Sequence, residues 1–369
     1  MAVTGVHQFV PMLHVGDAVG RHTLGLQALL RERGVASDIF VELPDPETEH
    51  LTRPADAYER EAAPGDVLVY QFATPSALAG WLAERPETLV VNYHNVTPPE
   101  FFAPWDNLLA RRHAAARAEL ARLAERAALG VAVSELNRRD LLEAGFGATR
   151  VIPPIVDRAV LEAATDSRPA GQAPPPAGVR WLAVGRLAPN KALEEVVAAL
   201  LLHRARHDPA ATLSVVGRPA LEVYAAALRA YVAELGLSGA VRFEGRVGPG
   251  ALAGAYRSAD VLVTASEHEG FCLPVVEAMA YGLPVVARRR GAVPEVLGDA
   301  GVLVDEAGPT ALSEAAAALA GDAPLRSTLV DAGRRRVGEL GLEEAGARLA
   351  ELLVGIHGGA HPGPEPRRR

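Results

Sequence analysis

The 369-residue sequence is poor in cysteine, lysine, aromatic residues and positive charge. Cys272 is the only cysteine, so the chain can form neither an intrachain disulfide nor a cysteine-rich metal site. The formal net charge of −8 argues against general nucleic-acid binding, which depends on neutralising phosphates. No apolar run is long enough to span a membrane, and Met1–Val10 lacks the features of a signal peptide. These absences predict a soluble cytoplasmic protein.

The last twelve residues contain many glycines and prolines and end in three arginines. A disordered end is the favoured interpretation. Three charges are too few to predict firm attachment to an anionic membrane, so membrane contact is expected to be peripheral at most.

Strands alternate with helices in both halves of the chain, which predicts two doubly wound α/β domains with parallel sheets. Apolar runs predict strands in the first half at Val6–Leu13, Ser37–Val41, Asp66–Tyr70, Leu89–Tyr93, Gly130–Val133 and Arg150–Ile152. In the second half they predict strands at Arg180–Val184, Thr212–Val216, Val241–Phe243, Val261–Thr264, Val285–Ala287 and Gly301–Val304. Helical periodicity is clearest over Arg21–Arg33 and Ala110–Ala128.

Proline and glycine interrupt the pattern at residues 164–178, which predicts a linker there. The expected domains are residues 1–163 and 179–341, with residues 342–369 packing back on the first. Parallel strands end at one edge of a sheet, so we expect ligands to bind at the carboxyl ends of the strands.

Two carboxylates flank a strand–loop–helix corner in the second half. Val261–Val263 is expected to be a buried strand, and Pro274 favours a first helical turn, where its missing N–H costs nothing. Glu269 and Glu277 stand on either side, with seven residues between them. The free N–H groups of the helix start, with those of residues 270–272, can bind a phosphate or a polyhydroxylated ligand.

Lysine occurs once, although lysine and arginine together number 37. Lys191 follows the expected strand Trp181–Val184, in a second strand–loop–helix setting. A compact ammonium can act as a point charge on a phosphate where a planar guanidinium is too wide. A surface lysine at a helix start is the alternative interpretation.

Several blocks of this sequence resemble the retaining GT-B glycosyltransferases of family 4, also called glycosyl transferases group 1. The acidic signature of that family is Glu, seven residues, Glu, written here EGFCLPVVE. The other matching blocks are Val133–Glu135, Ile152–Asp157, Gly185–Lys191, Gly282–Ala287 and Pro294–Gly301. The resemblance implies two Rossmann-like domains facing a central cleft, with a C-terminal helix, expected at Leu342–Ile356, that crosses back to the first domain.

The resemblance assigns the donor side to the second domain. It implies that Arg186 and Lys191 bind the diphosphate, although Ala192 stands where the family usually has glycine. It implies that Glu277 binds the ribose hydroxyls and that Glu269 binds the sugar. The expected donor-binding residues are Gly16, Arg186, Lys191, Val247, Glu269, Gly270, Phe271, Cys272, Leu273 and Glu277.

The first domain carries the remaining candidates. The glycines around Gly16 do not form a GxGxxG fingerprint, which disfavours a dinucleotide-dependent oxidoreductase. They resemble the family's glycine loop, which places Gly16 near the diphosphate and Asp17 near the acceptor; an ordinary strand–helix turn is the alternative. His94 resembles the family histidine that touches the transferred sugar, with Asn95 beside it on the acceptor side. Ser134 matches an acceptor-side position or caps a helix.

The implied reaction moves a hexose from a nucleoside diphosphate sugar to an acceptor hydroxyl with retention. Its catalytic residues would be His94, Glu269, Arg186 and Lys191. No Asp-x-Asp metal site is present, and fixed cations with a helix N-terminus can stabilise the leaving diphosphate instead, so no metal or other cofactor is expected. The absence of an obvious covalent nucleophile fits a front-face displacement.

Other functions remain open. A glycoside hydrolase also uses two carboxylates, but its mechanism would give Arg186 and Lys191 no role. A phosphorylase needs a lysine for pyridoxal phosphate, and the only lysine already has a role. A sugar-nucleotide epimerase and a catalytically silent nucleotide-sugar-binding protein are the principal alternatives. The sequence leaves open the acceptor, the hexose, the choice between UDP and GDP, and the oligomeric state.

Overall fold

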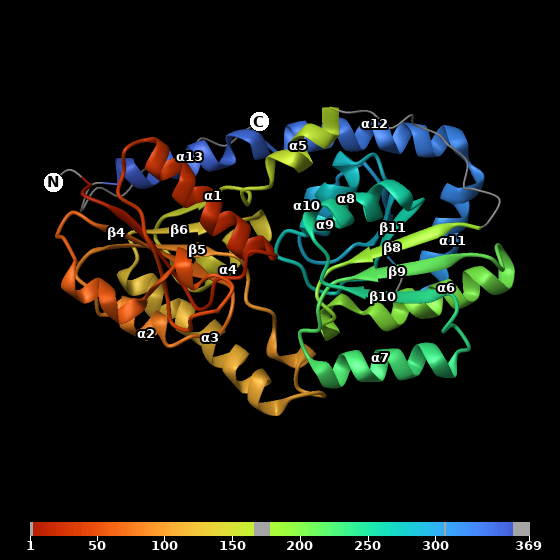
Figure 1. The fold of residues 1–369 in the computed structure, drawn as a ribbon, viewed down its shortest axis with the longest axis horizontal. Helices are drawn as coiled ribbons and strands as arrows, with labels where there is room; N and C mark the ends of the chain where they lie inside the picture. Colours follow the sequence, from red (N-terminus) through yellow and green to blue (C-terminus); the bar gives the residue numbers. More distant parts are fainter. Residues whose placement is uncertain (1–2, 166–177, 306–307, 357–369) are drawn as a thin grey trace. The chain divides into compact units, whose positions relative to one another are not determined.

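The computed structural model describes residues 3–165, 178–305 and 308–356. Its chain divides into two compact units, the first made of Met1–Asp157 with Gly341–Arg369 and the second of Arg158–Leu340 (Figure 1). The first unit thus ends at Asp157 rather than at residue 163, because α5 (Arg158–Thr165) packs against helices of the second unit. Most of the expected linker, residues 166–177, lies outside the described residues.

Unit 1 is built on a seven-stranded parallel sheet with the strand order β3-β2-β1-β4-β5-β6-β7. Its strands are β1 (Val6–Val10), β2 (Ile39–Val41), β3 (Arg53–Pro54), β4 (Val67–Phe72), β5 (Thr88–Tyr93), β6 (Leu129–Ala132) and β7 (Thr149–Val151). Its helices are α1 (Ala18–Glu32), α2 (Leu78–Ala83), α3 (Asn107–Arg126), α4 (Glu135–Glu143) and α13 (Leu342–Gly355), with short 3-10 turns η1 (Glu49–Leu51), η2 (Ala55–Arg60) and η3 (Pro99–Phe101).

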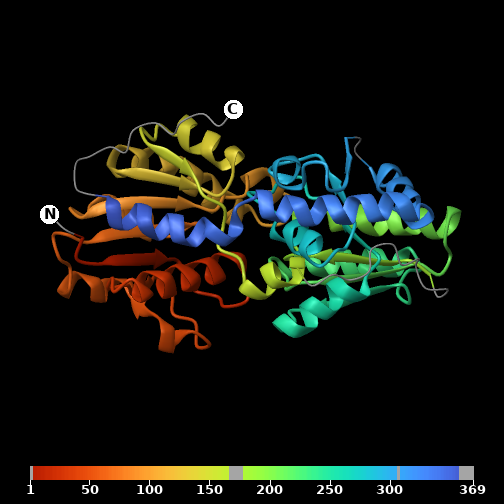
Figure 2. The ribbon, with the colours of Figure 1, turned by 90° about the horizontal axis from the view of Figure 1, so that it is seen from above.

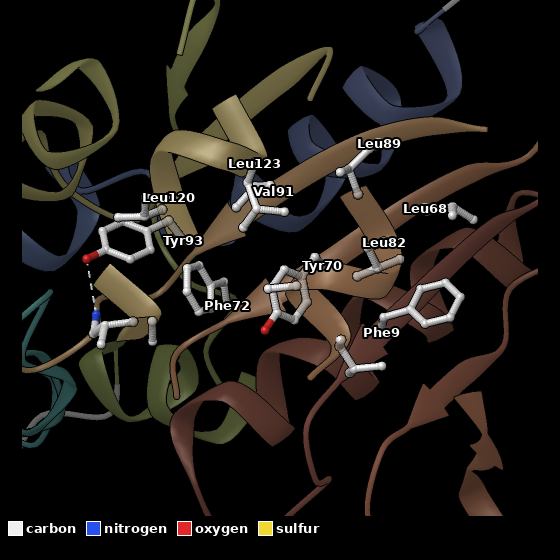
Figure 3. Close-up of a cluster of buried hydrophobic side chains, with 14 of the residues drawn as sticks. Phe9, Leu68, Tyr70, Phe72, Leu82, Leu89, Val91, Tyr93, Leu120 and Leu123 are labelled. Carbon is white, nitrogen blue, oxygen red and sulfur yellow. Dashed lines mark hydrogen bonds between the residues drawn. The ribbon is translucent and has the colours of Figure 1, made fainter. Parts of the chain in front are cut away.

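Alternate residues of the central strands fill two cores, one on each face of this sheet. Val67 and Val69 of β4 pack on the face that α1 and α13 cover (Figure 2), and this position of α13 agrees with the expected return of the last helix. Leu68, Tyr70 and Phe72 pack on the opposite face with α2 and α3 (Figure 3). Successive side chains point to opposite faces of a strand, so a strand buried on both faces has a continuous apolar run.

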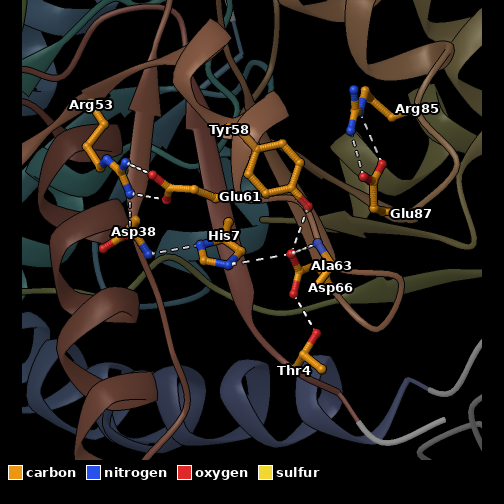
Figure 4. Close-up of polar contacts among 10 residues, drawn as sticks. All are labelled: Thr4, His7, Asp38, Arg53, Tyr58, Glu61, Ala63, Asp66, Arg85 and Glu87. Carbon is orange, nitrogen blue, oxygen red and sulfur yellow. Dashed lines mark hydrogen bonds and ion pairs between the residues drawn. The ribbon is translucent and has the colours of Figure 1, made fainter.

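The amino ends of β1 and β4 are held by a buried carboxylate. Asp66 accepts hydrogen bonds from Thr4 Oγ1 at 2.6 Å, from the hydroxyl of Tyr58 at 2.9 Å and from the backbone N–H of Ala63 at 3.0 Å (Figure 4). His7 lies beside it, and burial lowers the pKa of His7. This polar cluster stabilises the edge of the sheet opposite the carboxyl ends of its strands.

Unit 2 contains a six-stranded parallel sheet with the order β10-β9-β8-β11-β12-β13. Its strands are β8 (Arg180–Val184), β9 (Thr212–Val216), β10 (Val241–Gly245), β11 (Val261–Thr264), β12 (Val285–Arg288) and β13 (Val302–Val304). Besides α5, its helices are α6 (Leu193–Arg206), α7 (Glu222–Glu234), α8 (Pro249–Ser258), α9 (Leu273–Ala280), α10 (Val293–Leu297), α11 (Pro309–Gly321) and α12 (Ala323–Glu339), with a 3-10 turn η4 (Pro189–Lys191).

Each sheet has a point where the strand order reverses. In unit 2 the reversal lies between β8 and β11, which are hydrogen-bonded neighbours. In unit 1 it lies between β1 and β4. Because loops diverge at such a point, the carboxyl ends of these strands are where doubly wound sheets bind ligands.

Candidate active site

The loop from β11 to α9 ends in a backbone conformation that exposes N–H groups. Cys272 is the N-cap of α9 and adopts a left-handed conformation, with φ of 76°. The backbone N–H groups of Gly270, Phe271, Cys272 and Leu273 donate to no residue that the structure describes. Four donors in sequence at the start of a helix form the type of site that binds phosphate or hydroxyl oxygens.

Glu269 and Lys191 form an ion pair at the switch point. Lys191 Nζ donates to Glu269 Oε1 at 2.5 Å, and the two side chains are 17% and 9% exposed. Lys191 comes from the end of η4, after β8, and Glu269 from the loop after β11. The sequence predicted both residues in the donor site, and the fold brings them into direct contact.

The Cys272 thiol lies next to this pair. Burial and the Glu269 carboxylate raise the pKa of Cys272 well above its ordinary value. The thiol is therefore protonated at neutral pH and is a weak nucleophile. Its proximity to Glu269 makes the chain's single cysteine a reporter of this loop.

Two glycines lie at the ends of β8 and β9, beside Lys191. Gly185 has a φ of 145°, and a Cβ built on it would make an ordinary contact with Lys191 Cε at 3.5 Å. A Cβ on Gly217 would lie 1.8 Å from the carbonyl oxygen of Gly185, so no other residue fits at position 217. The ends of the two strands therefore approach each other closely next to Lys191.

Arg186 follows Gly185 and is exposed. Its guanidinium forms no hydrogen bond or ion pair with the parts of the chain that the structure describes. An anionic ligand at the β8 end would therefore not have to displace a protein partner from Arg186.

Glu277 lies on α9 and is buried, with 4% exposure. The hydroxyl of Tyr256 donates to Glu277 Oε2 at 2.7 Å, and the Tyr256 ring stacks on Tyr281 with centroids 5.4 Å apart. This contact orients the carboxylate, and no pattern in the sequence predicted a role for Tyr256. Val247, the remaining donor-side candidate, lies in the β10–α8 loop and is partly buried.

Hydrogen bonds join the loop that carries Lys191, after β8, to the loop that carries Glu269, after β11. The N–H of Glu267 donates to the carbonyl of Asn190 at 2.9 Å, and Asn190 Nδ2 donates to the carbonyl of His268 at 3.0 Å. The N–H of Ala292 donates to the carbonyl of Glu269 at 3.0 Å. Three loops are thereby held together beneath the Lys191–Glu269 pair.

A buried arginine also joins these loops. Arg288, the last residue of β12, is 1% exposed and pairs with both Glu195 and Glu267. Burial opposes the charge of Arg288, but the hydrogen bonds that its guanidinium donates to the two glutamates outweigh this effect and raise the pKa of Arg288. Arg288 could not be predicted from the sequence as a site residue, because arginine is common throughout the chain.

In unit 1, His94 follows β5 and belongs to a buried polar network. His94 Nε2 lies 2.6 Å from Gln71 Oε1, and the ring of His22 contacts His94 edge to face, with centroids 4.9 Å apart. Asn92 Nδ2 lies 2.8 Å from His22 Nε2, and the backbone N–H of Ile155 donates to His22 Nδ1 at 3.0 Å. The sequence predicted only His94 of this network.

Burial keeps both histidines neutral. Burial lowers the pKa of His22 to about 4. Burial, with a smaller contribution from His22, lowers the pKa of His94 well below its ordinary value. At neutral pH the imidazole of His94 therefore offers hydrogen bonds rather than a positive charge.

The other unit-1 candidates lie at helix starts and in a strained loop. Asp17 caps α1 by accepting from the N–H of Gly20 at 2.8 Å, and Gly16 before it is exposed. Ser134 is fully buried and caps α4, accepting from the N–H of Asn137 at 3.2 Å, which is the alternative considered from the sequence. Asn95 has a φ of 84° and donates to Asn137 Oδ1 at 2.9 Å.

The described residues contain neither a candidate metal-ion cluster nor a helix able to cross a membrane. Within residues 3–165, 178–305 and 308–356, no cluster of three or more His, Cys, Asp or Glu side chains could hold a metal ion. Over the same residues, no helix combines the length and apolar character needed to cross a bilayer.

Comparison with known protein sequences gives matches to part of the chain. Residues 173–336 match the family model described as glycosyl transferases group 1. MMP alpha-(1->4)-mannosyltransferase of Mycolicibacterium hassiacum is 42% identical over 112 residues, which is 30% of this chain and 27% of that protein. D-inositol 3-phosphate glycosyltransferase of Streptomyces coelicolor is 34% identical over 180 residues, 47% of this chain and 39% of that protein. The chain thus spans less than half the length of these curated relatives.

Solved structures match nearly the whole chain. Anabaena HepE in complex with UDP and glucose has a TM-score of 0.72 at 17% identity, covering 95% of this chain and 100% of that one. Sucrose-phosphate synthase from Thermosynechococcus elongatus has a TM-score of 0.73 at 21% identity, covering 94% and 98%. At these identities the likeness concerns the fold, and the predicted pair of doubly wound Rossmann-like domains is confirmed.

Proposed function

Because residues 173–336 match the model of the glycosyl transferases group 1 family, we propose that the chain is a retaining, metal-independent glycosyltransferase of the GT-B fold. It transfers a hexose from a nucleoside diphosphate sugar to an acceptor hydroxyl. The observation that carries the proposal is the Lys191–Glu269 pair, which lies beside four free backbone N–H groups where the strand order of unit 2 reverses.

Stabilisation of the leaving diphosphate is the main chemical task of unit 2. The bond between the anomeric carbon and the diphosphate oxygen breaks, and negative charge grows on that oxygen. Lys191, Arg186 and the N-terminus of α9 supply fixed positive potential at this point, with no need to reorganise during the reaction. The Arg186 guanidinium is exposed and has no partner among the described residues, which supports its assignment to the diphosphate.

Glu269 has two successive partners in this proposal. Without a nucleotide it neutralises Lys191. A bound diphosphate brings negative charge to the same ammonium group, so we expect Glu269 to give up part of this contact and accept hydrogen bonds from sugar hydroxyls. This exchange keeps the buried lysine neutralised in both states.

Glu277 and His94 complete the set of contacts. Glu277 binds the ribose hydroxyls, with Tyr256 holding one of its carboxylate oxygens. His94 contacts the transferred sugar as a neutral imidazole. The acceptor hydroxyl attacks from the side of the departing diphosphate, whose oxygen takes the acceptor proton, so retention needs no covalent intermediate. Gly16, Asp17 and Asn95 are assigned to the glycine loop and the acceptor side.

The proposal is tested first by nucleotide binding. Thermal stabilisation is measured with UDP, GDP, ADP and dTDP, because a ligand at a hundredfold its dissociation constant adds about 2.7 kcal/mol to the stability. We expect one nucleoside diphosphate, UDP or GDP, to stabilise the protein. Stabilisation by none of the four would contradict the proposal.

Turnover is tested by release of that nucleoside diphosphate from its hexose conjugates, with D-inositol 3-phosphate among the acceptors because of the relative described above. Release in EDTA, with the anomeric configuration retained in the product, is expected. Dependence on Mg²⁺ or Mn²⁺ would refute the metal-independent mechanism. Binding without release would favour a silent nucleotide-sugar-binding protein, and interconversion of sugar epimers would favour an epimerase.

A further inference from the structure

Arg288 links two carboxylates that belong to different loops of the candidate site. Its Nη1 donates to Glu195 Oε1 at 3.1 Å, and Nη2 and Nη1 make further contacts with Glu195 and Glu267. Arg288 is 1% exposed, whereas Glu195 and Glu267 are 28% and 31% exposed. The forked guanidinium therefore reaches both glutamates from beneath, out of contact with solvent.

Each of these glutamates is next to one member of the Lys191–Glu269 pair. Glu195 lies in the first turn of α6, four residues after Lys191, and its negative charge is favoured at this helix start. Glu267 lies two residues before Glu269. A displacement of either glutamate would therefore move one partner of the ion pair.

The loop after β12 supports the same region through its backbone. A Cβ on Gly291 would lie 2.7 Å from the backbone N of Glu269, so the loop after β12 packs directly against the loop that carries Glu269. Arg289, next along the chain, behaves differently, since it is exposed and pairs with Asp305 on the surface. Arg290, the following residue, is exposed and makes one longer contact, from Nε to Glu267 Oε2 at 3.4 Å, so of these three arginines only Arg288 contacts both glutamates.

We infer that Arg288 is a positioning residue, which holds the Lys191 loop and the Glu269 loop at the separation that diphosphate binding requires. Without it, Glu267 would keep only its contact with the exposed Arg290, no cation would join Glu195 to Glu267, and the two loops would separate. The consequence for nucleotide binding rests on the proposed function, but the effect on the loops does not.

The first experiment follows the loops without a nucleotide. Alkylation of Cys272 by iodoacetamide is measured by mass spectrometry across a range of pH, because this thiol lies beside Glu269. In Arg288→Met we expect the rate to rise by about tenfold or more, since local opening exposes the thiol. Arg289→Met removes the same charge one residue away and is expected to match the wild type.

A loss of global stability could also expose the thiol, so a third variant controls for it. Leu228→Ala creates a cavity under α7, a helix outside this network. We expect Leu228→Ala to lose stability without a specific increase in Cys272 alkylation under native conditions. Arg288→Lys, which retains a charge but not the fork, should restore part of the protection.

The second experiment measures affinity for UDP or GDP by calorimetry in a double-mutant cycle. Arg288→Met is expected to weaken binding by between about tenfold and about a hundredfold, as displaced site residues do. The effect should largely disappear in the Lys191→Met background, because Arg288 acts through that pair.

Each result has a distinct meaning. Equal Cys272 alkylation in Arg288→Met and Arg289→Met, or additive losses of affinity in the cycle, would overturn the inference. If the wild-type protein binds neither UDP nor GDP, the proposed function fails, and the alkylation rates still decide whether Arg288 holds the loops.

Discussion

The Lys191–Glu269 pair makes a quantitative prediction for Lys191→Met, which removes the charge and keeps an unbranched side chain. Glu269 is 9% exposed and would be left without its partner. Breaking a buried ion pair in this way costs about 3–5 kcal/mol. Because Lys191 is 17% exposed and partly solvated, we expect a smaller loss than this, about 2–3 kcal/mol of unfolding free energy.

The reverse change should cost less. In Glu269→Gln the ammonium of Lys191 can turn toward water, so a loss of about 1 kcal/mol is expected. The double variant Lys191→Met/Glu269→Gln leaves no unpaired charge and should be no less stable than Lys191→Met alone. The coupling between the two positions is therefore expected to be about 1–2 kcal/mol.

The assay uses the single tryptophan of unit 2. The chain has three tryptophans, and Trp181 is the only one within Arg158–Leu340. With Trp81 and Trp105 replaced by phenylalanine, Trp181 fluorescence follows the urea unfolding of unit 2. Additive losses from the two substitutions, with no coupling, would refute the ion pair as a stabilising contact.

Turnover supplies the second part of this prediction. Removing one preorganised cation costs about 2–4 kcal/mol of transition-state stabilisation, so kcat/KM of Lys191→Met should fall by about 30-fold to 1000-fold. Arg186→Ala should lose a similar amount of activity and little stability, because Arg186 is exposed. Activity of both variants within a factor of about two of the wild type would contradict the diphosphate assignment.

Three further predictions concern other parts of the chain. Glu277→Gln should weaken nucleoside diphosphate binding about tenfold while Glu269→Gln mainly slows transfer; calorimetry paired with rates would expose the reverse assignment. Tyr58→Phe should lower the unfolding free energy of unit 1 by about 1.5–3 kcal/mol, since the buried Asp66 loses a charged hydrogen bond, and an unchanged urea midpoint would exclude this role. His22 has a native pKa of about 4, below its unfolded value of about 6.5, so the unfolded state binds the proton first and stability should fall as pH drops from about 6.5 toward 4. His22→Gln should remove that part of the pH dependence, and an unaltered profile would show that His22 does not cause it.

The strands of unit 2 were predictable because most of them are short apolar runs bounded by turn residues. All six expected strands of this unit are present. In unit 1, β3 was missed because Arg53–Pro54 is only two residues long and carries no apolar pattern. A strand of this length exists only through its pairing with β2, and such a tertiary contact leaves no periodicity in the sequence.

Site residues of a type or spacing that is unusual in this chain could be predicted, and site residues of a common type could not. Glu269 and Lys191 could be found because paired carboxylates and a single lysine are unusual in this chain. His22 occupies an ordinary position on an amphipathic helix, and nothing local distinguishes it from a solvent-facing residue. Its role depends on Asn92 and the backbone of Ile155, which are distant in sequence.

The choice between lysine and arginine at this site follows from the space that each position offers. Lys191 passes close to the backbone of Gly185 and reaches one carboxylate oxygen, which suits a narrow side chain with a single charged atom. Arg288 lies between two carboxylates and must reach both, which suits a fork. In a chain that otherwise uses arginine for its cationic side chains, the retention of lysine at position 191 indicates that shape, in addition to charge, constrains this position. The same geometry predicts that the two cations are not interchangeable, since an ammonium at 288 lacks the fork that contacts both carboxylates.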